Sequence, residues 1–142
     1  MNIEKLQGMV NTSPFAIFSG FEVVSMDLEG QQLEMRMPMK PEFERLANTG
    51  QMHGGPIAAL IDTVGCYALV MGLDGNLPTI EFSTTYLRPV IDTDLRAIAT
   101  VRKSGRSVAL VDIDVTDKKD KLVAIGRGVY HTGSAVPNDT KN

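Results

Sequence analysis

The apolar and polar positions divide the chain into one long apolar stretch and several segments in which the two kinds of residue alternate. Residues 33 to 37 alternate Leu and two Met with Glu and Arg, and residues 111 to 116 alternate Val, Ile and Val with Asp, Asp and Thr. A period of two is expected of a strand with one buried face and one face in water. We therefore predict strands at residues 21–28, 33–37, 79–88, 95–103, 108–117 and 122–131.

The long apolar stretch, residues 54–73, carries polar groups only at Asp62, Thr63 and Tyr67. Its apolar residues follow helical spacing, and Pro56 suits the first turn, where its missing N–H has no partner to lose. Twenty apolar residues can span a bilayer, but a central Asp would cost roughly 2.5–3.5 kcal/mol there. The stretch also lacks flanking Lys and Arg clusters. We predict a helix buried in the middle of a protein, and no membrane span.

The remaining segments complete a predicted α+β fold. We expect a short helix at residues 3–11, a polar loop at 40–53 that is long enough to suggest a function, and a loose tail at 133–142. No internal repeat or linker interrupts residues 1–142, which we interpret as a single domain. The order is two strands, one long helix and an antiparallel meander of four strands. An antiparallel sheet of about six strands, wrapped around one long central helix, would bury the apolar surface of both.

Composition narrows the classes of function. The chain has 142 residues, with 14 Lys and Arg against 17 Asp and Glu and a net charge of −3, and it has no Trp. A dedicated nucleic-acid binder usually carries a basic face, so we expect no nucleic-acid partner. A single cysteine, Cys66, excludes an internal disulfide and a Cys-rich metal site. Because residues 1–6 lack the layout of a signal peptide, we expect a cytoplasmic protein.

Two features of the predicted helix suggest chemistry. Asp62 lies in its middle with no Lys, Arg or His within a turn, and a buried carboxylate without a partner is costly unless it has a function. Alternatively, Asp62 lies on a narrow wet stripe or binds another chain. At the start of the helix, His53-Gly54-Gly55 offers backbone N–H groups that a ligand can approach closely. Gly54 and Asp62 are eight residues apart, about 12 Å along a helix, so a site that uses both must combine two subunits of a homodimer.

Four motifs together resemble a known family. They are His53-Gly54-Gly55, Asp62 nine residues after the His, the sequence TIEFSTTYLRP at residues 79–89, and GRSVALVDIDV at residues 105–115. Their order and spacing resemble the hotdog-fold acyl-CoA thioesterases, most closely the phenylacetate-pathway (PaaI-like) type. The resemblance extends from Phe21 to Thr132. The fold it implies is the one that the hydrophobic pattern predicts.

The resemblance implies a thioester hydrolase without a serine nucleophile. Asp62 would act as a base toward water or as the nucleophile, and Thr79 would help to position the water. The backbone N–H groups of Gly54 and Gly55 of the partner subunit would bind the carbonyl oxygen. The family often has an Asn six residues before the His of this motif; here Ala47 stands there, and Asn48, five residues before, is the substitute.

The same resemblance implies how the substrate is held. Coenzyme A carries phosphates, and the candidate residues to bind it are Arg88, Lys103, Gly105 and Arg106. No metal or separate cofactor is expected, coenzyme A being part of the substrate, and the protein is expected to be a homodimer or a homotetramer. The acyl group would be selected by side chains around Phe15, Phe18, Met37 and Tyr67.

The roles of single residues and of the protein as a whole have alternatives. For His53 we favour a hydrogen bond that orients the loop over proton transfer, and we interpret Cys66 as a small core residue. A non-catalytic acyl-CoA sensor with the same fold would not need Asp62. A hydratase or dehydratase would need a His and a carboxylate over the acyl chain, whereas this helix has an Asp and no His.

Overall fold

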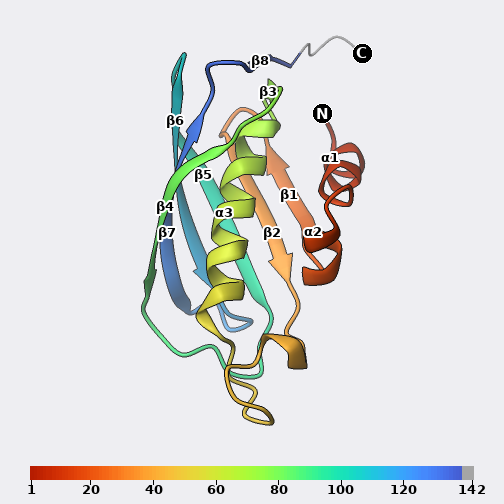
Figure 1. Cartoon of the computed structure of the whole chain (residues 1–142), viewed down its shortest axis with the longest axis vertical. Coiled ribbons are helices and arrows are strands. Elements are labelled where there is room, and N and C mark those ends of the chain that lie inside the picture. The colour runs from red at the N-terminus through yellow and green to blue at the C-terminus, as the bar shows by residue number, and fades with distance from the viewer. Residues whose placement is uncertain (139–142) are drawn as a thin grey trace.

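A computed structural model describes residues 1–138 of the chain (Figure 1). Most of the predicted elements are present, with ends that differ by a few residues. In chain order the elements are α1 (Ile3–Val10), α2 (Pro14–Ser19), β1 (Glu22–Asp27), β2 (Gln32–Met37), the 3-10 turn η1 (Pro41–Phe43), α3 (Gly54–Val70), β3 (Leu73–Asp74), β4 (Thr79–Tyr86), β5 (Leu95–Ser104), β6 (Val108–Thr116), β7 (Leu122–His131) and β8 (Val136–Pro137).

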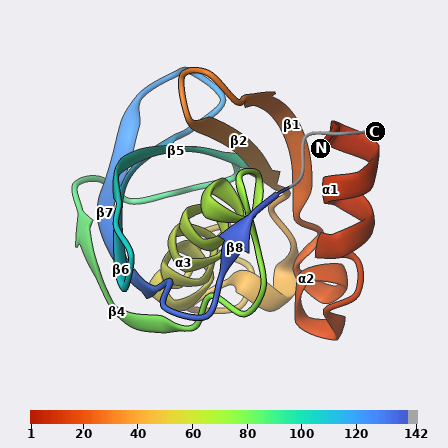
Figure 2. The ribbon, with the colours of Figure 1, turned by 90° about the horizontal axis from the view of Figure 1, so that it is seen from above.

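One antiparallel sheet wraps around α3. Its strand order is β1-β2-β5-β6-β7-β4. Seen from above, the strands form an arc with α3 inside it, while α1 and α2 lie beyond β1 (Figure 2). This arrangement confirms the predicted α+β fold with six strands around a central helix.

The position of β4 differs from the predicted four-stranded meander. β5, β6 and β7 do follow one another, but β4 pairs with β7 at the edge of the sheet, and β5 pairs with β2. After β4 the chain crosses past the N-terminal end of α3, where the amide of Met52 binds the carbonyl oxygen of Val90 at 2.8 Å. In the sheet β6 and β7 therefore lie between β5 and β4, and β4 has no neighbour on its outer side within the described chain.

Two further predictions are wrong in part. The sequence after residue 11 not only ends α1 but starts α2: the Ser13 side chain caps the amide of Ala16, and Gly20 ends the helix with a φ of 71°. The predicted loose tail forms β8, which pairs with β3, and the Asn138 side chain binds carbonyl oxygens at the end of α3. Residues 139–142 of that tail lie outside the described residues.

The core lies between α3 and the inner face of the sheet. Residues such as Leu60, Ile61 and Val64 on one side of α3 are fully buried against the sheet. The opposite side of α3 is a half-buried stripe, with no described element that covers it completely: Ala58, Ala59, Asp62, Thr63, Cys66, Tyr67 and Val70. None of the helices in residues 1–138 is long and apolar enough to cross a membrane.

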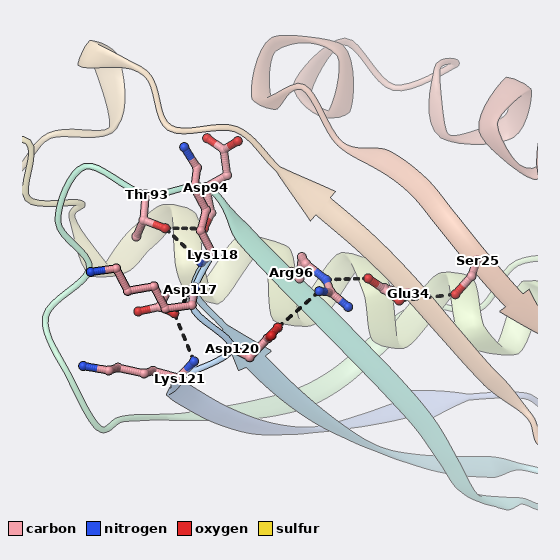
Figure 3. Close-up of polar contacts among 10 residues, drawn as sticks. Ser25, Glu34, Thr93, Asp94, Arg96, Asp117, Lys118, Asp120 and Lys121 are labelled. Carbon is pink, nitrogen blue, oxygen red and sulfur yellow. Dashed lines mark hydrogen bonds and ion pairs between the residues drawn. The ribbon is translucent and has the colours of Figure 1, made fainter.

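The outer face of the sheet carries the polar half of the alternating pattern. Arg96 on β5 binds Glu34 at 2.6 Å and Asp120 at 3.3 Å, and Ser25 donates to the same Glu34 (Figure 3). Partial burial alone would raise the pKa of Asp94, but hydrogen bonds from the Met39 amide and the Arg36 guanidinium outweigh it and lower that pKa. Ion pairs with this exposure contribute little stability each, so the buried face determines the fold.

We predict opposite effects for alanine at two helical glycines. Gly65 on α3 packs so closely against Tyr130 that an added methyl group would overlap the Tyr130 hydroxyl, whereas Gly8 on α1 has nothing within 4 Å. Gly65→Ala should lower the free energy of unfolding by about 1–2 kcal/mol, since overpacking outweighs the gain of helix propensity. Gly8→Ala should raise it by up to about 1 kcal/mol. Urea unfolding at equal protein concentration measures both, and an equal change in the two variants would contradict the packing argument.

Candidate active site

The N-terminal end of α3 is held from two sides. His53 is the N-cap residue, and its Nδ1 accepts a hydrogen bond from the Gly55 amide at 3.2 Å. This bond places the ring hydrogen of neutral His53 on Nε2. The Tyr86 hydroxyl, from the end of β4, donates to the carbonyl oxygen of Gly54 at 2.8 Å. The Gly54 amide, at the first helical position, has no acceptor within the helix and is available to a ligand.

A cavity opens beside this end of the helix. Its volume is about 440 Å³, and Arg45, His53, Gly54, Tyr86 and Arg88 are among the residues that line it. The Arg88 guanidinium also donates to the carbonyl oxygen of Leu122, which fixes this side chain at the cavity wall. A cation and a free helical amide thus share one cavity, and both suit an anionic or strongly polarised group.

Asp62 lies in the half-buried stripe on the open side of α3 and binds the start of β4. The Thr79 hydroxyl donates to its Oδ1 at 2.8 Å, and the Tyr130 hydroxyl donates to its backbone carbonyl at 2.9 Å. Of the two alternatives given for Asp62, the structure agrees with the narrow wet stripe, because the sheet covers only the other side of α3. Thr79, which the resemblance implies as a residue that positions the water, thus contacts the Asp62 carboxylate directly.

The thiol of Cys66 lies one turn beyond Asp62 on the same side of α3. Burial raises its pKa to about 11, and the charge of Asp62 adds to the rise. The thiol is therefore protonated at neutral pH and is a poor nucleophile.

The residues predicted for the site form two groups at opposite ends of β4. Thr79 begins β4 beside Asp62, and Tyr86 ends it beside Gly54, about 23 Å away at ~3.3 Å per residue. The turn that carries Lys103, Gly105 and Arg106 lies at the Asp62 end. The Thr132 hydroxyl binds the carbonyl oxygen of Gly105, and the amide of the preceding residue, His131, binds the carbonyl oxygen of Pro78, next to Thr79. A single chain therefore does not bring the two groups together.

The group at the Asp62 end comprises Asp62, Thr79, Lys103, Gly105 and Arg106. The group at the other end comprises His53, Gly54, Gly55 and Arg88.

Asn48 joins neither group through a side-chain contact in the described part of the chain. It lies exposed in the loop after η1 with a φ of 63°, and its backbone amide binds the Glu44 carboxylate at 2.7 Å. Sequence reasoning also missed two hydroxyl groups that position the site, those of Tyr86 and Tyr130. Tyr86 falls within the motif at residues 79–89, but no periodicity distinguishes it from its neighbours. Among residues 1–138, no group of three or more His, Cys, Asp or Glu is placed to hold a metal ion.

Comparison with known proteins connects this geometry to a family. The family described as Thioesterase superfamily matches residues 49–124. The chain is 34% identical over 101 residues to human acyl-coenzyme A thioesterase 13, which covers 68% of this chain and 71% of that protein. It is 34% identical over 116 residues to acyl-coenzyme A thioesterase PaaI of Escherichia coli, with 79% of this chain and 77% of that protein covered.

Solved structures agree with these matches. The structure of the E. coli PaaI protein has a TM-score of 0.76 and 28% identity, covering 88% of each chain. The crystal structure of zebra fish thioesterase superfamily member 2 has a TM-score of 0.76 and 25% identity, covering 92% of this chain and 98% of that one. These findings confirm the resemblance inferred from the four motifs and the hotdog fold that it implies.

We predict that His53 stabilises the helix as a cap. His53→Ala should lower the free energy of unfolding by about 1 kcal/mol, because the Gly55 amide loses its acceptor. His53→Asn restores a side-chain acceptor at the same position and should recover most of the loss. Urea unfolding of the three proteins provides the measurement, and equal stability of the Ala and Asn variants would exclude the capping role.

Proposed function

Because this chain belongs to the thioesterase superfamily, and is a thioester hydrolase, we propose that it hydrolyses acyl-CoA to a free carboxylic acid and coenzyme A. The relatives named as acyl-coenzyme A thioesterases support this substrate class. The observation that carries the mechanism is that one edge strand, β4, contacts Asp62 at one end and Gly54 at the other. We propose that two copies of this edge pair in a homodimer, which either acts alone or forms a dimer of dimers.

The surface of β4 supports such a pairing. An edge strand presents unpaired N–H and C=O groups that another strand can bind. β4 also exposes large apolar side chains: Ile80 is 55% exposed, Phe82 40% and Tyr86 51%. The Thr84 hydroxyl in the same strand is buried and has no hydrogen-bond partner among the described residues. A second β4 strand would pair the backbone groups and cover the apolar side chains.

The register of the proposed pairing follows from the two contacts. If a two-fold axis passes through the position of Ser83, antiparallel strands place the partner's Tyr86 opposite Ile80, beside Thr79 at the bulge. Asp62, bound to Thr79, then lies near the partner's Gly54, bound to that Tyr86. The two groups of candidate residues meet across the axis, and the dimer contains two equivalent sites.

In the proposed site the substrate carbonyl lies between Asp62 and the partner's helix terminus. The partner's Gly54 amide donates to the carbonyl oxygen of the substrate. The partner's Gly55 amide donates to the same oxygen once it gives up its hydrogen bond to the His53 nitrogen. These donors stabilise the negative charge that develops as the carbonyl carbon is attacked. Thr79 holds the Asp62 carboxylate in place by a hydrogen bond and orients the attacking water.

The electron and proton balance is that of hydrolysis. The water oxygen forms a bond to the carbonyl carbon while Asp62 accepts a proton, and the carbon–sulfur bond then breaks so that the proton can pass to the departing thiolate. If Asp62 attacks directly, water resolves the resulting anhydride. Arg88 of one subunit and Arg106 of the other then supply cations for the coenzyme A phosphates, with Lys103 and Gly105 in the same turn as Arg106.

Asp62→Asn should abolish turnover and leave the assembly unchanged, because the amide keeps the shape of the carboxylate but accepts no proton. We expect a loss of at least about a hundredfold in thiol release from a panel of short, long and aromatic acyl-CoAs. Asp114→Asn, an exposed carboxylate on the outer face of β6, is the matched control and should retain full activity. If neither wild type nor variant shows turnover while both bind acyl-CoA, the protein is a binding or sensor protein.

Mixing two inactive variants should restore activity if each site uses two subunits. Gly55→Val places a branched side chain at the helix terminus, where it blocks the substrate. The fold tolerates the added Cβ, because its nearest neighbour, His53 Nδ1, is 3.7 Å away. A heterodimer of Asp62→Asn with Gly55→Val holds one site with both defects and one intact site. After unfolding and refolding together, random pairing should give about a quarter of wild-type activity. No recovery, with heterodimers verified by mass, would place Asp62 and Gly55 of one site on the same subunit.

A further inference from the structure

A second cavity adjoins Asp62 on the side away from Gly54. Its volume is about 360 Å³, and it is lined by the C-terminal half of α3, by α1 and by the loop before β4. Two of its lining residues lie on α3 beyond Asp62: Cys66 one turn further along and Val70 two turns further along. The cavity therefore continues the half-buried stripe of α3. The Asp62 carboxylate binds Thr79, two residues after Leu77 in the cavity wall, and so lies near the cavity.

The cavity suits a hydrocarbon group. Met9, Tyr67, Val70 and Leu77 supply apolar surface, and no charged residue is among those that line it. The Cys66 thiol is directed at the carbonyl oxygen of Leu77, 3.6 Å away, while Thr12 and Asn76 are the polar residues at the cavity wall. By contrast, the cavity beside Gly54 has Arg45 and Arg88 in its wall and suits the charged part of a substrate.

Tyr67 lines the cavity and connects α3 to α1. Its hydroxyl donates to the carbonyl oxygen of Met9 at 3.2 Å, which fixes the ring between the two helices. The other side chains considered for acyl selection lie elsewhere: Phe15 and Phe18 are exposed on α2, and Met37 is completely buried in the core. Tyr67 is therefore the one of the four that contacts this cavity.

On the basis of the proposed function, we infer that this cavity holds the hydrocarbon part of the acyl group and that Tyr67 sets its length limit. Asp62 and Val70 are about 12 Å apart along the helix, and Asp62 and Tyr67 about 7.5 Å. An extended chain gains about 1.2 Å per bond, so these distances correspond to roughly ten and six carbons. The preferred substrate is thus a medium-chain acyl thioester of about six to ten carbons.

The first test compares chain-length profiles. Wild type should show the highest kcat/KM near eight carbons and a decline beyond about ten. Tyr67→Ala should raise the ratio of kcat/KM for fourteen carbons over eight carbons by about tenfold or more. Tyr67→Phe keeps the ring, and Phe18→Ala alters an exposed aromatic on α2; both should keep the wild-type profile. An active Tyr67→Ala variant with an unchanged profile would overturn the inference and leave the proposed function standing.

A second test needs no turnover and no folded Tyr67 variant. Cys66 is the only cysteine, so its alkylation by iodoacetamide reports on the cavity. Since the pKa of the thiol is about 11, the reaction is slow at neutral pH and is best followed near pH 9. The thioether octyl-CoA, which cannot be hydrolysed, should slow alkylation of the wild-type protein at least about fivefold relative to coenzyme A alone. Equal rates with saturating octyl-CoA and coenzyme A would overturn the inference, even if acyl-CoA hydrolysis is demonstrated.

Discussion

The helix α3 is apolar on nearly every side, but the sheet covers only one side of it. The apolar surface of α3 that the sheet leaves uncovered determines the rest of the structure. The six strands curve around α3 and bury Leu60, Ile61 and Val64, yet the stripe through Asp62 and Cys66 remains half-buried. Apolar surface that is left uncovered in one chain is the usual mark of a binding site or of an interface. In the proposed dimer the stripe serves both purposes, since substrate and partner meet along it.

The contacts of β4 turn that uncovered surface into a defined site. Its first residue binds the Asp62 carboxylate and its last residue binds the carbonyl of Gly54, so the strand holds two turns of α3 at a fixed spacing. Neither contact would survive a slip of the strand by one residue, because every side chain would move to the other face. The bulge between Thr79 and Glu81 adjusts the direction of Thr79 at the point where it meets α3. Precision at the site thus comes from a strand at the edge of the sheet.

Local periodicity predicted much of this fold and part of the site. The period of two at residues 111–116 and the apolar run of residues 54–73 depend on near neighbours, and both elements are present as β6 and α3. Strand order depends on distant pairing, so the pattern could not show that β4 lies beside β7. The choice between a buried Asp62 and one on a wet stripe stayed open for a related reason: periodicity shows that a helix is apolar but not how far the sheet reaches around it. The β8 strand was not predicted because a strand of two residues shows no periodicity. The role of Tyr86 was not predicted because it depends on a contact with Gly54, which is distant in sequence.

The pairing of β4 with β7 also has a consequence for the order in which the chain acquires structure during synthesis. Thr79 pairs with Tyr130, so β4 and the apolar α3 before it leave the ribosome well before the strand that receives them. Long-range pairing of this kind is slow, and the intermediate exposes apolar surface that chaperones bind. The edge that would recruit a second subunit is therefore ordered only after β7 has been made. Under the proposed assembly, subunit association follows folding of the sheet, and a chain shortened before β7 would leave β4 without the strand that holds it in the sheet.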